Sequence, residues 1–169
     1  MATATFVPVA EYLRTSYEPA CEYIDGVLRP KSMGTKKHAL LQHRLCKAIE
    51  RQGYQALPEI TVRVAQTRYL IPDVAVDREI EDPYPTKPVP LVIEVLSPED
   101  RLGAALAKCE EYHQWGVPVC WVIDPERQTA WEYRKGGEPT KIDRRGTMTA
   151  SEISVELDEM FAVKPDSGS

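Results

Sequence analysis

The chain has 169 residues, of which 43% are hydrophobic and 28% are charged, and its formal net charge is −5. This is the composition of an ordinary globular protein, so we expect a single domain over residues 1–169, with its core at about 8–163 and poorly ordered termini. The acidic charge argues against a protein that coats nucleic acid by bulk charge, although a local basic strip is compatible with it.

The cysteines and the hydropathy pattern restrict the class of protein further. The spacing of the cysteines fits no zinc-binding pattern, which predicts buried free thiols at Cys21, Cys46, Cys109 and Cys120. The sequence has no run of about 18 apolar residues, and no basic segment leads into an apolar one at its start. We therefore expect a cytoplasmic protein with no membrane partner.

The first predicted elements are a short helix, a hairpin and a longer helix. The short helix is expected at 9–14 and the β-hairpin at 22–28, where Asp25-Gly26 between apolar pairs is a strong turn signal. The longer helix is expected at 35–51, because its apolar residues recur at helical spacing.

Two strands and a long loop follow. Alternating apolar residues predict a half-buried strand at 60–64, and a turn then leads into a strand at 69–76. The segment 77–90 carries four prolines and a run of charges, so it is predicted to be a loop.

The second half of the chain predicts a β-α-β unit made of a strand at 91–96, a helix at 101–115 and a strand at 119–123. Strands joined in this way are parallel, with a right-handed crossover. Further strands are expected at 129–133 and 153–157. The predicted fold class is therefore α/β, with a mixed central sheet and a helix on each face.

Two carboxylates stand in segments that otherwise consist of buried apolar residues. Asp73 follows Pro72 within the first segment, and Glu94 lies inside the strand at 91–96. An ionised carboxylate that is removed from water needs a cation, a set of hydrogen-bond donors or a raised pKa. A divalent metal ion meets that need, so Asp73 and Glu94 are candidate metal ligands.

Several short motifs follow one another along the chain: a Pro-Asp pair on a strand, a run that ends Glu-Val-Leu-Ser-Pro, a helix with Lys and Tyr, and a strand Trp-x-x-Asp-Pro. Their positions, with those of the upstream hairpin and first long helix, are Glu22 to Gly26, His38, Pro72-Asp73, Glu94 to Pro98, Lys108, Tyr112, Gly116-Val117 and Trp121 to Pro125. This series resembles the Uma-two family of endonucleases, which in turn resembles the PD-(D/E)XK nucleases. The match covers roughly residues 8–163.

The resemblance implies a restriction-endonuclease-like core with an N-terminal β-hairpin. It also implies a metal-dependent endonuclease that hydrolyses phosphodiester bonds in DNA. In such a site Mg²⁺ or Mn²⁺ would be held by Asp73, Glu94 and the backbone carbonyl of Val95. DNA would be the partner, and a homodimer, whose two sites meet two strands, is an arrangement that the resemblance allows.

The nuclease pattern also calls for a lysine two residues after the glutamate, where it orients the water or offsets the developing charge. Leu96 occupies that position in this chain. The resemblance offers Lys108 instead, which lies at the edge of the core-facing stripe of the helix at 101–115. The alternative is an ordinary surface lysine, with its stem on apolar surface and its ammonium in water.

Three further residues are candidates for the same site. Glu22 is an accessory ligand of a metal or a water molecule or, equally, a solvent-facing residue of the hairpin. His38 and His43 lack the i, i+4 spacing of a two-histidine metal face, so His38 is expected to be a hydrogen-bonded residue of the site wall. Tyr112 is expected in the core, with a place in the site wall as the alternative.

Three functions remain open at this point. The first is a metal-dependent DNA endonuclease with Asp73, Glu94, Lys108 and Glu22 as its catalytic residues. The second is a catalytically inactive protein of the same fold that binds nucleic acid or a protein partner, which the acidic charge and Leu96 favour. The third is a hydrolase that uses two carboxylates as acid and base, as glycosidases do, although no tryptophan adjoins the carboxylates in the sequence.

Overall fold

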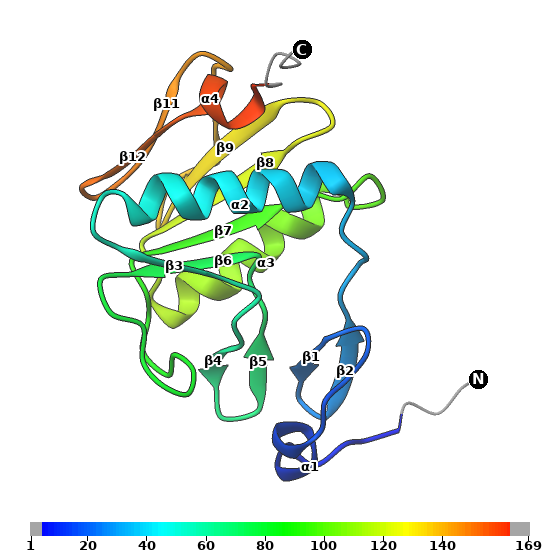
Figure 1. Cartoon of the computed structure of the whole chain (residues 1–169). Coiled ribbons are helices and arrows are strands. Elements are labelled where there is room, and N and C mark those ends of the chain that lie inside the picture. Colours follow the sequence, from blue (N-terminus) through cyan, green and yellow to red (C-terminus); the bar gives the residue numbers. More distant parts are fainter. Residues whose placement is uncertain (1–4, 163–169) are drawn as a thin grey trace, which may run out of the picture.

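The computed structural model describes residues 5–162. Poor order was expected at residues 1–8 and 164–169, and of these, residues 1–4 and 164–169 lie outside the described range. The helices of the described part are α1 (Val9–Arg14), α2 (Lys36–Glu50), α3 (Leu102–Trp115) and α4 (Leu157–Phe161). Figure 1 shows the long helix α2 on one side of a central sheet and α3 on the other.

The central sheet has six strands in the order β10-β9-β8-β7-β6-β3. These strands are β3 (Gln55–Pro58), β6 (Val74–Asp77), β7 (Leu91–Val95), β8 (Val119–Asp124), β9 (Thr129–Arg134) and β10 (Thr140–Ile142). β7 and β8 are parallel and are connected by α3, whereas the other neighbouring pairs are antiparallel. The mixed sheet with helices on both faces confirms the predicted α/β fold class and its β-α-β unit.

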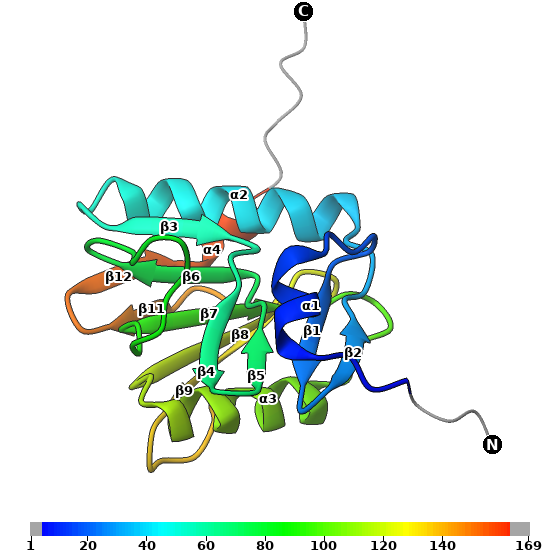
Figure 2. The same cartoon turned by 90° about the horizontal axis from the view of Figure 1, so that it is seen from below.

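A second sheet has four strands in the order β2-β1-β5-β4, and it lies at the lower end of the view in Figure 1. Its strands are β1 (Cys21–Ile24), β2 (Val27–Pro30), β4 (Val62–Ala65) and β5 (Arg68–Leu70). Figure 2 shows this sheet from that end, with α1 packed on it. Tyr12 of α1 stacks on Tyr23 with ring centroids 4.9 Å apart, so an aromatic cluster holds the helix to the sheet.

A separate hairpin of β11 (Thr147–Ala150) and β12 (Ile153–Glu156) precedes α4. Apolar residues of this hairpin and of α4 join the cluster that α2 forms with the central sheet, and examples are Met148, Ile153 and Leu157. The face of the sheet under α2 is therefore covered by three elements and is fully shielded from water.

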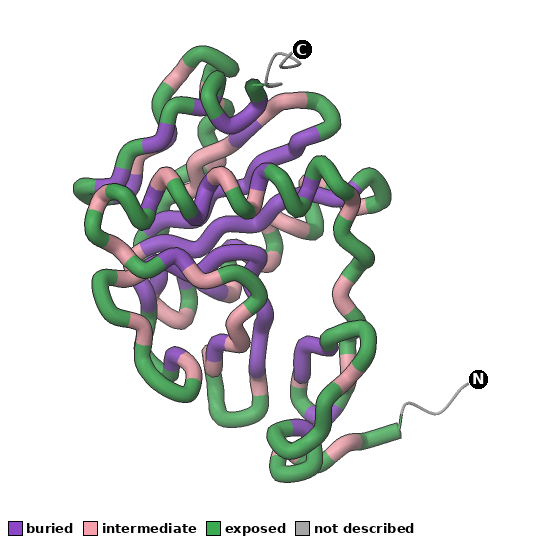
Figure 3. Tube along the Cα trace, in the orientation of Figure 1, coloured by how far each residue is buried: buried purple, intermediate pink, exposed green. Residues whose placement is uncertain are grey.

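The two faces of the central sheet are buried under different helices, because side chains alternate along each strand. On β7, Ile93 packs with Leu45 of α2, whereas Val92 packs with Tyr112 of α3. Figure 3 shows the buried trace that runs through the central strands. Glu94 is two positions after Val92, so its side chain lies on the same face of the sheet and is directed toward α3.

The prediction of a single strand at 69–76 is wrong. The structure divides the segment into β5 and β6, which belong to different sheets and are separated by residues 71–73. Pro72 has no N–H and cannot donate to a ladder. The N–H of Ile71 donates to the carboxylate of Glu22 at 2.9 Å instead of to a neighbouring strand. The chain therefore passes from one sheet to the other at this point.

Other corrections concern short segments. Four short elements, β3, β10, β11 and α4, were not predicted, because each has too few residues for a hydrophobic period to be recognised. The expectation that the start of the chain is poorly ordered is wrong for Val7. Its N–H donates to the carbonyl of Gly26 at 2.9 Å, and its carbonyl accepts a hydrogen bond from the hydroxyl of Tyr23 at 2.7 Å.

The cysteines and the helices agree with two of the expectations about protein class. Each of the four cysteines is free and buried, as predicted. None of the helices within residues 5–162 is long and apolar enough to cross a membrane.

Gly116 ends α3 with a φ of 126°, and a Cβ atom at this position would lie 2.7 Å from Cγ of Pro88. We expect Gly116→Ala to lower the free energy of unfolding by roughly 1–3 kcal/mol, because the backbone is strained and the side chain clashes. Gly103→Ala is the matched control, since an added Cβ meets no atom within 4 Å there. Urea denaturation measures both variants, and an equal loss of stability in the two would contradict the prediction.

Candidate active site

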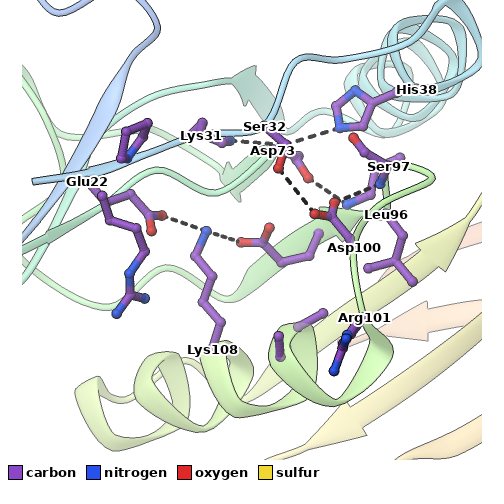
Figure 4. A pocket seen from close by; sticks show the side chains of 16 residues that line it. Glu22, Lys31, Ser32, His38, Asp73, Leu96, Ser97, Asp100, Arg101 and Lys108 are labelled. Carbon is purple, nitrogen blue, oxygen red and sulfur yellow. Dashed lines mark hydrogen bonds and ion pairs between the residues drawn. The ribbon is translucent and has the colours of Figure 1, made fainter.

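A cavity of about 230 Å³ opens where the two sheets meet the first turns of α2 and α3. Its charged lining residues are Glu22, Asp73, Glu94 and Asp100 of the acidic type and Arg29, Lys31, Arg101 and Lys108 of the basic type. Figure 4 shows Glu22, Asp73 and Lys108 directed into this space from different elements. Charged groups from distant parts of the sequence are thus collected in one place.

Asp73 is buried in the segment that connects the two sheets. Its Oδ2 accepts a hydrogen bond from the N–H of Val95 at 2.7 Å, while its Oδ1 lies 3.0 Å from Nζ of Lys31 and 3.4 Å from Nε2 of His38. Burial raises the pKa of Asp73, but His38, Lys31 and the N–H of Val95 outweigh it and hold that pKa well below its ordinary value. Asp73 is therefore a fixed negative charge.

Glu94 is the acidic side chain of β7 and is 7% exposed. Its Oε1 accepts a hydrogen bond from the hydroxyl of Tyr112 at 3.0 Å and lies 3.0 Å from Nζ of Lys108. Burial raises the pKa of Glu94 to about 7, with Lys108 opposing this shift and the charge of Asp73 reinforcing it. Glu94 can therefore bind or release a proton near neutral pH.

Lys108 connects the two walls of the cavity. Its Nζ lies 2.6 Å from Oε1 of Glu22 and 3.0 Å from Oε1 of Glu94, and it donates to the carbonyl of Ile71 at 3.3 Å. Burial lowers the pKa of Lys108, but the two glutamates raise it further than burial lowers it, so the ammonium stays charged. The alternatives of a surface lysine at 108 and a solvent-facing Glu22 are both wrong, because both side chains are enclosed in the cavity.

Lys31 is a second lysine of the site, and the sequence analysis missed it. Its Nζ lies 3.0 Å from Oδ1 of Asp73 and 2.8 Å from Oε2 of Glu59, and it donates to the carbonyl of Ile71 at 2.9 Å. Burial lowers the pKa of Lys31, but Asp73 and Glu94 raise it above its ordinary value. Each of the two lysines thus neutralises a different buried carboxylate.

A signal for Lys31 was present in the sequence. The hairpin turn at Asp25-Gly26 pairs Glu22 with Arg29 across β1 and β2. Because side chains two positions apart on a strand share a face, Arg29 and Lys31 lie on the same side as Glu22. The register of the hairpin therefore predicts that both basic residues accompany this glutamate.

His38 and Tyr112 support the carboxylates from α2 and α3. Thr35 caps α2 by accepting a hydrogen bond from the N–H of His38 at 3.2 Å, which fixes the first turn beside Asp73. Burial lowers the pKa of His38, but its hydrogen bond to Asp73 raises it above the ordinary value. Tyr112 is fully buried behind Glu94 and does not line the cavity, so the suggestion that it belongs to the site wall is wrong.

Leu96 occupies the position at which the nuclease pattern calls for a lysine. It is 5% exposed and belongs to the apolar cluster that includes Tyr112 and Cys109. Lys108 brings an ammonium to Glu94 from the helix, whereas Leu96, just after the end of β7, is used for packing. None of the described residues that line the cavity is Trp, Tyr or Phe, so the aromatic platform of a typical sugar site is missing.

The donor set determines whether a divalent metal ion fits this site. Mg²⁺ is usually held by one or two carboxylates together with water molecules, and the cavity supplies Asp73, Glu94 and the backbone of Val95. Among residues 5–162 no three His, Cys, Asp or Glu side chains are arranged as a ready-made metal cage. Lys31 and Lys108 contact the carboxylates instead. The donor types fit a partly hydrated Mg²⁺ or Mn²⁺, provided that these ammonium groups shift away from the carboxylate oxygens.

The mixed sheet and the cavity of buried carboxylates and lysines are the features expected of a restriction-endonuclease-like protein. The Uma2 family, described as "Putative restriction endonuclease", matches residues 9–160. Since this match spans most of the chain, the protein belongs to the Uma2 family, and the resemblance noted in the sequence is confirmed.

Two solved structures are similar to this chain. A crystal structure of a "putative nuclease belonging to DUF820" from Anabaena variabilis ATCC 29413 has 23% identity and a TM-score of 0.77, and the alignment covers 92% of this chain and 97% of that one. At this identity the likeness shows the fold. A cryo-electron microscopy structure of a DrdV–DNA complex has 17% identity and a TM-score of 0.45, with 62% of this chain and 67% of that one covered. No match was found among curated proteins.

The raised pKa of Glu94 predicts how stability depends on pH. The folded protein holds this proton up to a pH of about 7, whereas the ordinary pKa is 4.5. The stabilisation that comes from protonated Glu94 is therefore fully present below its ordinary pKa and is lost as the pH rises through its pKa in the folded protein. It amounts to at most about 3 kcal/mol. We expect the free energy of unfolding, measured by urea titration with EDTA, to fall between about pH 5 and pH 8.

Two variants distinguish the residues that contribute to the pH dependence of the free energy of unfolding. Glu94→Gln should make the pH dependence flatter, because it removes the titrating group. His38→Gln should remove a smaller part, since the raised pKa of His38 also stabilises the fold below its ordinary pKa and loses this effect as the pH rises. If Glu94→Gln has the slope of the wild type, the burial of Glu94 does not control this titration.

Proposed function

We propose that this chain is a metal-dependent endonuclease that hydrolyses phosphodiester bonds in DNA. The observation that carries the proposal is the burial of Glu22, Asp73 and Glu94 in one cavity, with Lys108 in contact with two of them. Phosphodiester hydrolysis needs an activated water molecule and positive charge beside the phosphate, and acidic metal ligands with a lysine can supply both. Membership of the Uma2 family supports the same reaction.

Asp73, Glu94 and the carbonyl of Val95 would hold Mg²⁺ or Mn²⁺, with Glu22 as an accessory ligand through water. The bound ion would supply Lewis-acid stabilisation of the phosphate and a water molecule of lowered pKa. The protein prepares these ligands through hydrogen bonds from Tyr112 to Glu94 and from the N–H of Val95 to Asp73. The ligands are thus held in place by groups that do not themselves react.

Lys108 would orient the attacking water molecule and offset the negative charge that develops on the phosphate. Its ammonium is held between Glu22 and Glu94 and stays protonated, so it acts as a positive charge and not as a base. Lys31 would add a second positive charge beside Asp73. The lysine expected at position 96 is thereby replaced by one from the following helix.

A catalytically inactive nuclease-fold protein that binds nucleic acid or a protein partner is the second candidate. Leu96 favours it, because the usual lysine position is occupied by a packed apolar residue. The ion pairs of Lys31 and Lys108 favour it as well, since they satisfy the carboxylates without a metal ion.

The proposed reaction predicts that the purified protein cleaves DNA in the presence of Mn²⁺ or Mg²⁺ and does not do so with EDTA. Asp73→Asn and Glu94→Gln should each lower cleavage by on the order of a hundredfold or more, because each removes a charge that binds the metal ion. Gel assays on single-stranded, duplex and branched substrates measure this loss, and circular dichroism checks the fold of each variant.

Glu111→Gln is the matched control for these two substitutions. Glu111 lies on α3 but pairs with Arg68 outside the cavity, so cleavage should be unchanged. Cleavage that persists in Glu94→Gln would point to a contaminant or to another site. If the wild type cleaves none of the three substrates, the inactive candidate is the correct one.

The role of Lys108 can be separated from metal binding. Lys108→Ala should lower the rate by on the order of a hundredfold, which is the usual effect of removing one electrostatic stabiliser. The rise in Tm on addition of Mn²⁺ should remain, because Asp73 and Glu94 are unchanged. Lys47→Ala, at an exposed position of α2, is the control. A rate equal to that of the wild type would remove Lys108 from the mechanism.

A further inference from the structure

The cavity has two arginines at its edge that have no partner within the described residues 5–162. The other charged groups that line it are engaged: Lys31 with Asp73, Lys108 with Glu22 and Glu94, and Asp100 with the N–H of Ser97 and the hydroxyl of Ser32. Arg29 and Arg101 also line the cavity, yet within residues 5–162 their side chains make no hydrogen bond and no ion pair. Both are exposed to solvent.

Arg29 belongs to the wall formed by the small sheet. It lies directly opposite Glu22 in the register of β1 and β2, which places both side chains on the same face of the hairpin. A cross-strand ion pair would be expected at such a position. The carboxylate of Glu22 is engaged instead with Lys108 and with the N–H of Ile71. The guanidinium of Arg29 is therefore left free beside a buried carboxylate.

Arg101 belongs to the opposite wall, where it immediately precedes α3 with an extended backbone. Its acidic neighbour Asp100 is held by Ser97 and Ser32 and does not pair with it. Figure 4 shows Arg101 at the start of the helix, across the cavity from Glu22. The two free guanidinium groups thus come from the two sides of the opening.

The buried carboxylates outnumber the two lysines, so the four acidic and four basic groups of the lining balance only when the two arginines are included. Lys31 and Lys108 are held by the buried carboxylates, so Arg29 and Arg101 supply the positive charge that a ligand can reach at the edge of the cavity. Guanidinium groups match phosphate oxygens in geometry and are weakly hydrated, which makes arginine suited to phosphate binding. The chain as a whole has a net charge of −5, so such binding is local and does not arise from bulk charge.

We infer that Arg29 and Arg101 bind the backbone phosphates on either side of the phosphodiester that enters the cavity. This inference rests on the proposed function and specifies its substrate as a polynucleotide that continues in both directions from the bond that is cut. It predicts internal cleavage, because a terminal nucleotide would leave one of the two arginines without a phosphate. Contacts with backbone phosphates do not read the base sequence, so these two arginines would not confer sequence specificity.

The experiment measures binding in the Glu94→Gln background, so that the DNA is not cut. Fluorescence anisotropy with a labelled duplex of about 25 base pairs gives Kd over a range of salt concentrations. Arg29→Ala and Arg101→Ala should each weaken binding by on the order of tenfold at low salt and lower the slope of log K against log salt by about 1. Arg29→Lys and Arg101→Lys should regain part of the affinity, because the charge is kept.

Arg145→Ala is the matched control, because Arg145 is an exposed arginine outside the cavity. Equal Kd values and salt slopes for this control and for the two cavity variants would overturn the inference, as would a failure of the parent protein to bind DNA. In the otherwise wild-type enzyme, the cavity variants should raise KM with little change in kcat.

The outcomes for binding and for cleavage can be told apart. Binding that depends on both arginines, without any cleavage by the wild type, would support the phosphate contacts and reject the catalytic function. Cleavage with a Kd that is independent of both arginines would support the catalytic function and reject the phosphate contacts.

Discussion

The balance of charge inside one cavity is the constraint on which the rest of the structure depends. Glu22, Asp73 and Glu94 are almost completely removed from water, and isolated carboxylates in such a place would be strongly destabilising. Lys31 and Lys108 compensate for this, and their own burial is tolerated for the same reason. Removing one member would leave an opposite charge buried without its partner, so folding and function depend on the same side chains.

The crossover between the two sheets shows how closely the site and the fold are connected. At Ile71 and Pro72 the backbone leaves one sheet before it enters the other, so its polar groups lack strand partners. The N–H of Ile71 is satisfied by Glu22, and its carbonyl accepts from both Lys31 and Lys108. The residues that we propose for catalysis therefore also join the two sheets, and the effects of their substitution must be judged on folded protein.

The proposed function requires an acidic protein to act on DNA, and the distribution of charge in the cavity is compatible with this. The interior of the cavity combines lysines with the carboxylates that we propose as metal ligands, while two arginines that have no partner within residues 5–162 lie at its edge. Under the proposed function, these arginines would attract a phosphate backbone to the place where the reaction would occur. A protein of this kind need not bind DNA tightly along its whole length, because short-range contacts at the cavity select the position of one phosphodiester.

The sequence by itself determined the longer helices, several of the strands and most of the candidate residues. Helical periodicity defined α2 and α3, buried apolar surroundings singled out Asp73 and Glu94, and the order of the motifs indicated the family and Lys108. Only the tertiary structure decided that Lys31 contacts Asp73, that Tyr112 lies behind Glu94, and that the strand predicted at 69–76 is divided between two sheets. The physical reason is that periodicity reports which face of an element is buried, whereas contacts between segments 40 or more positions apart depend on how the sheets pack.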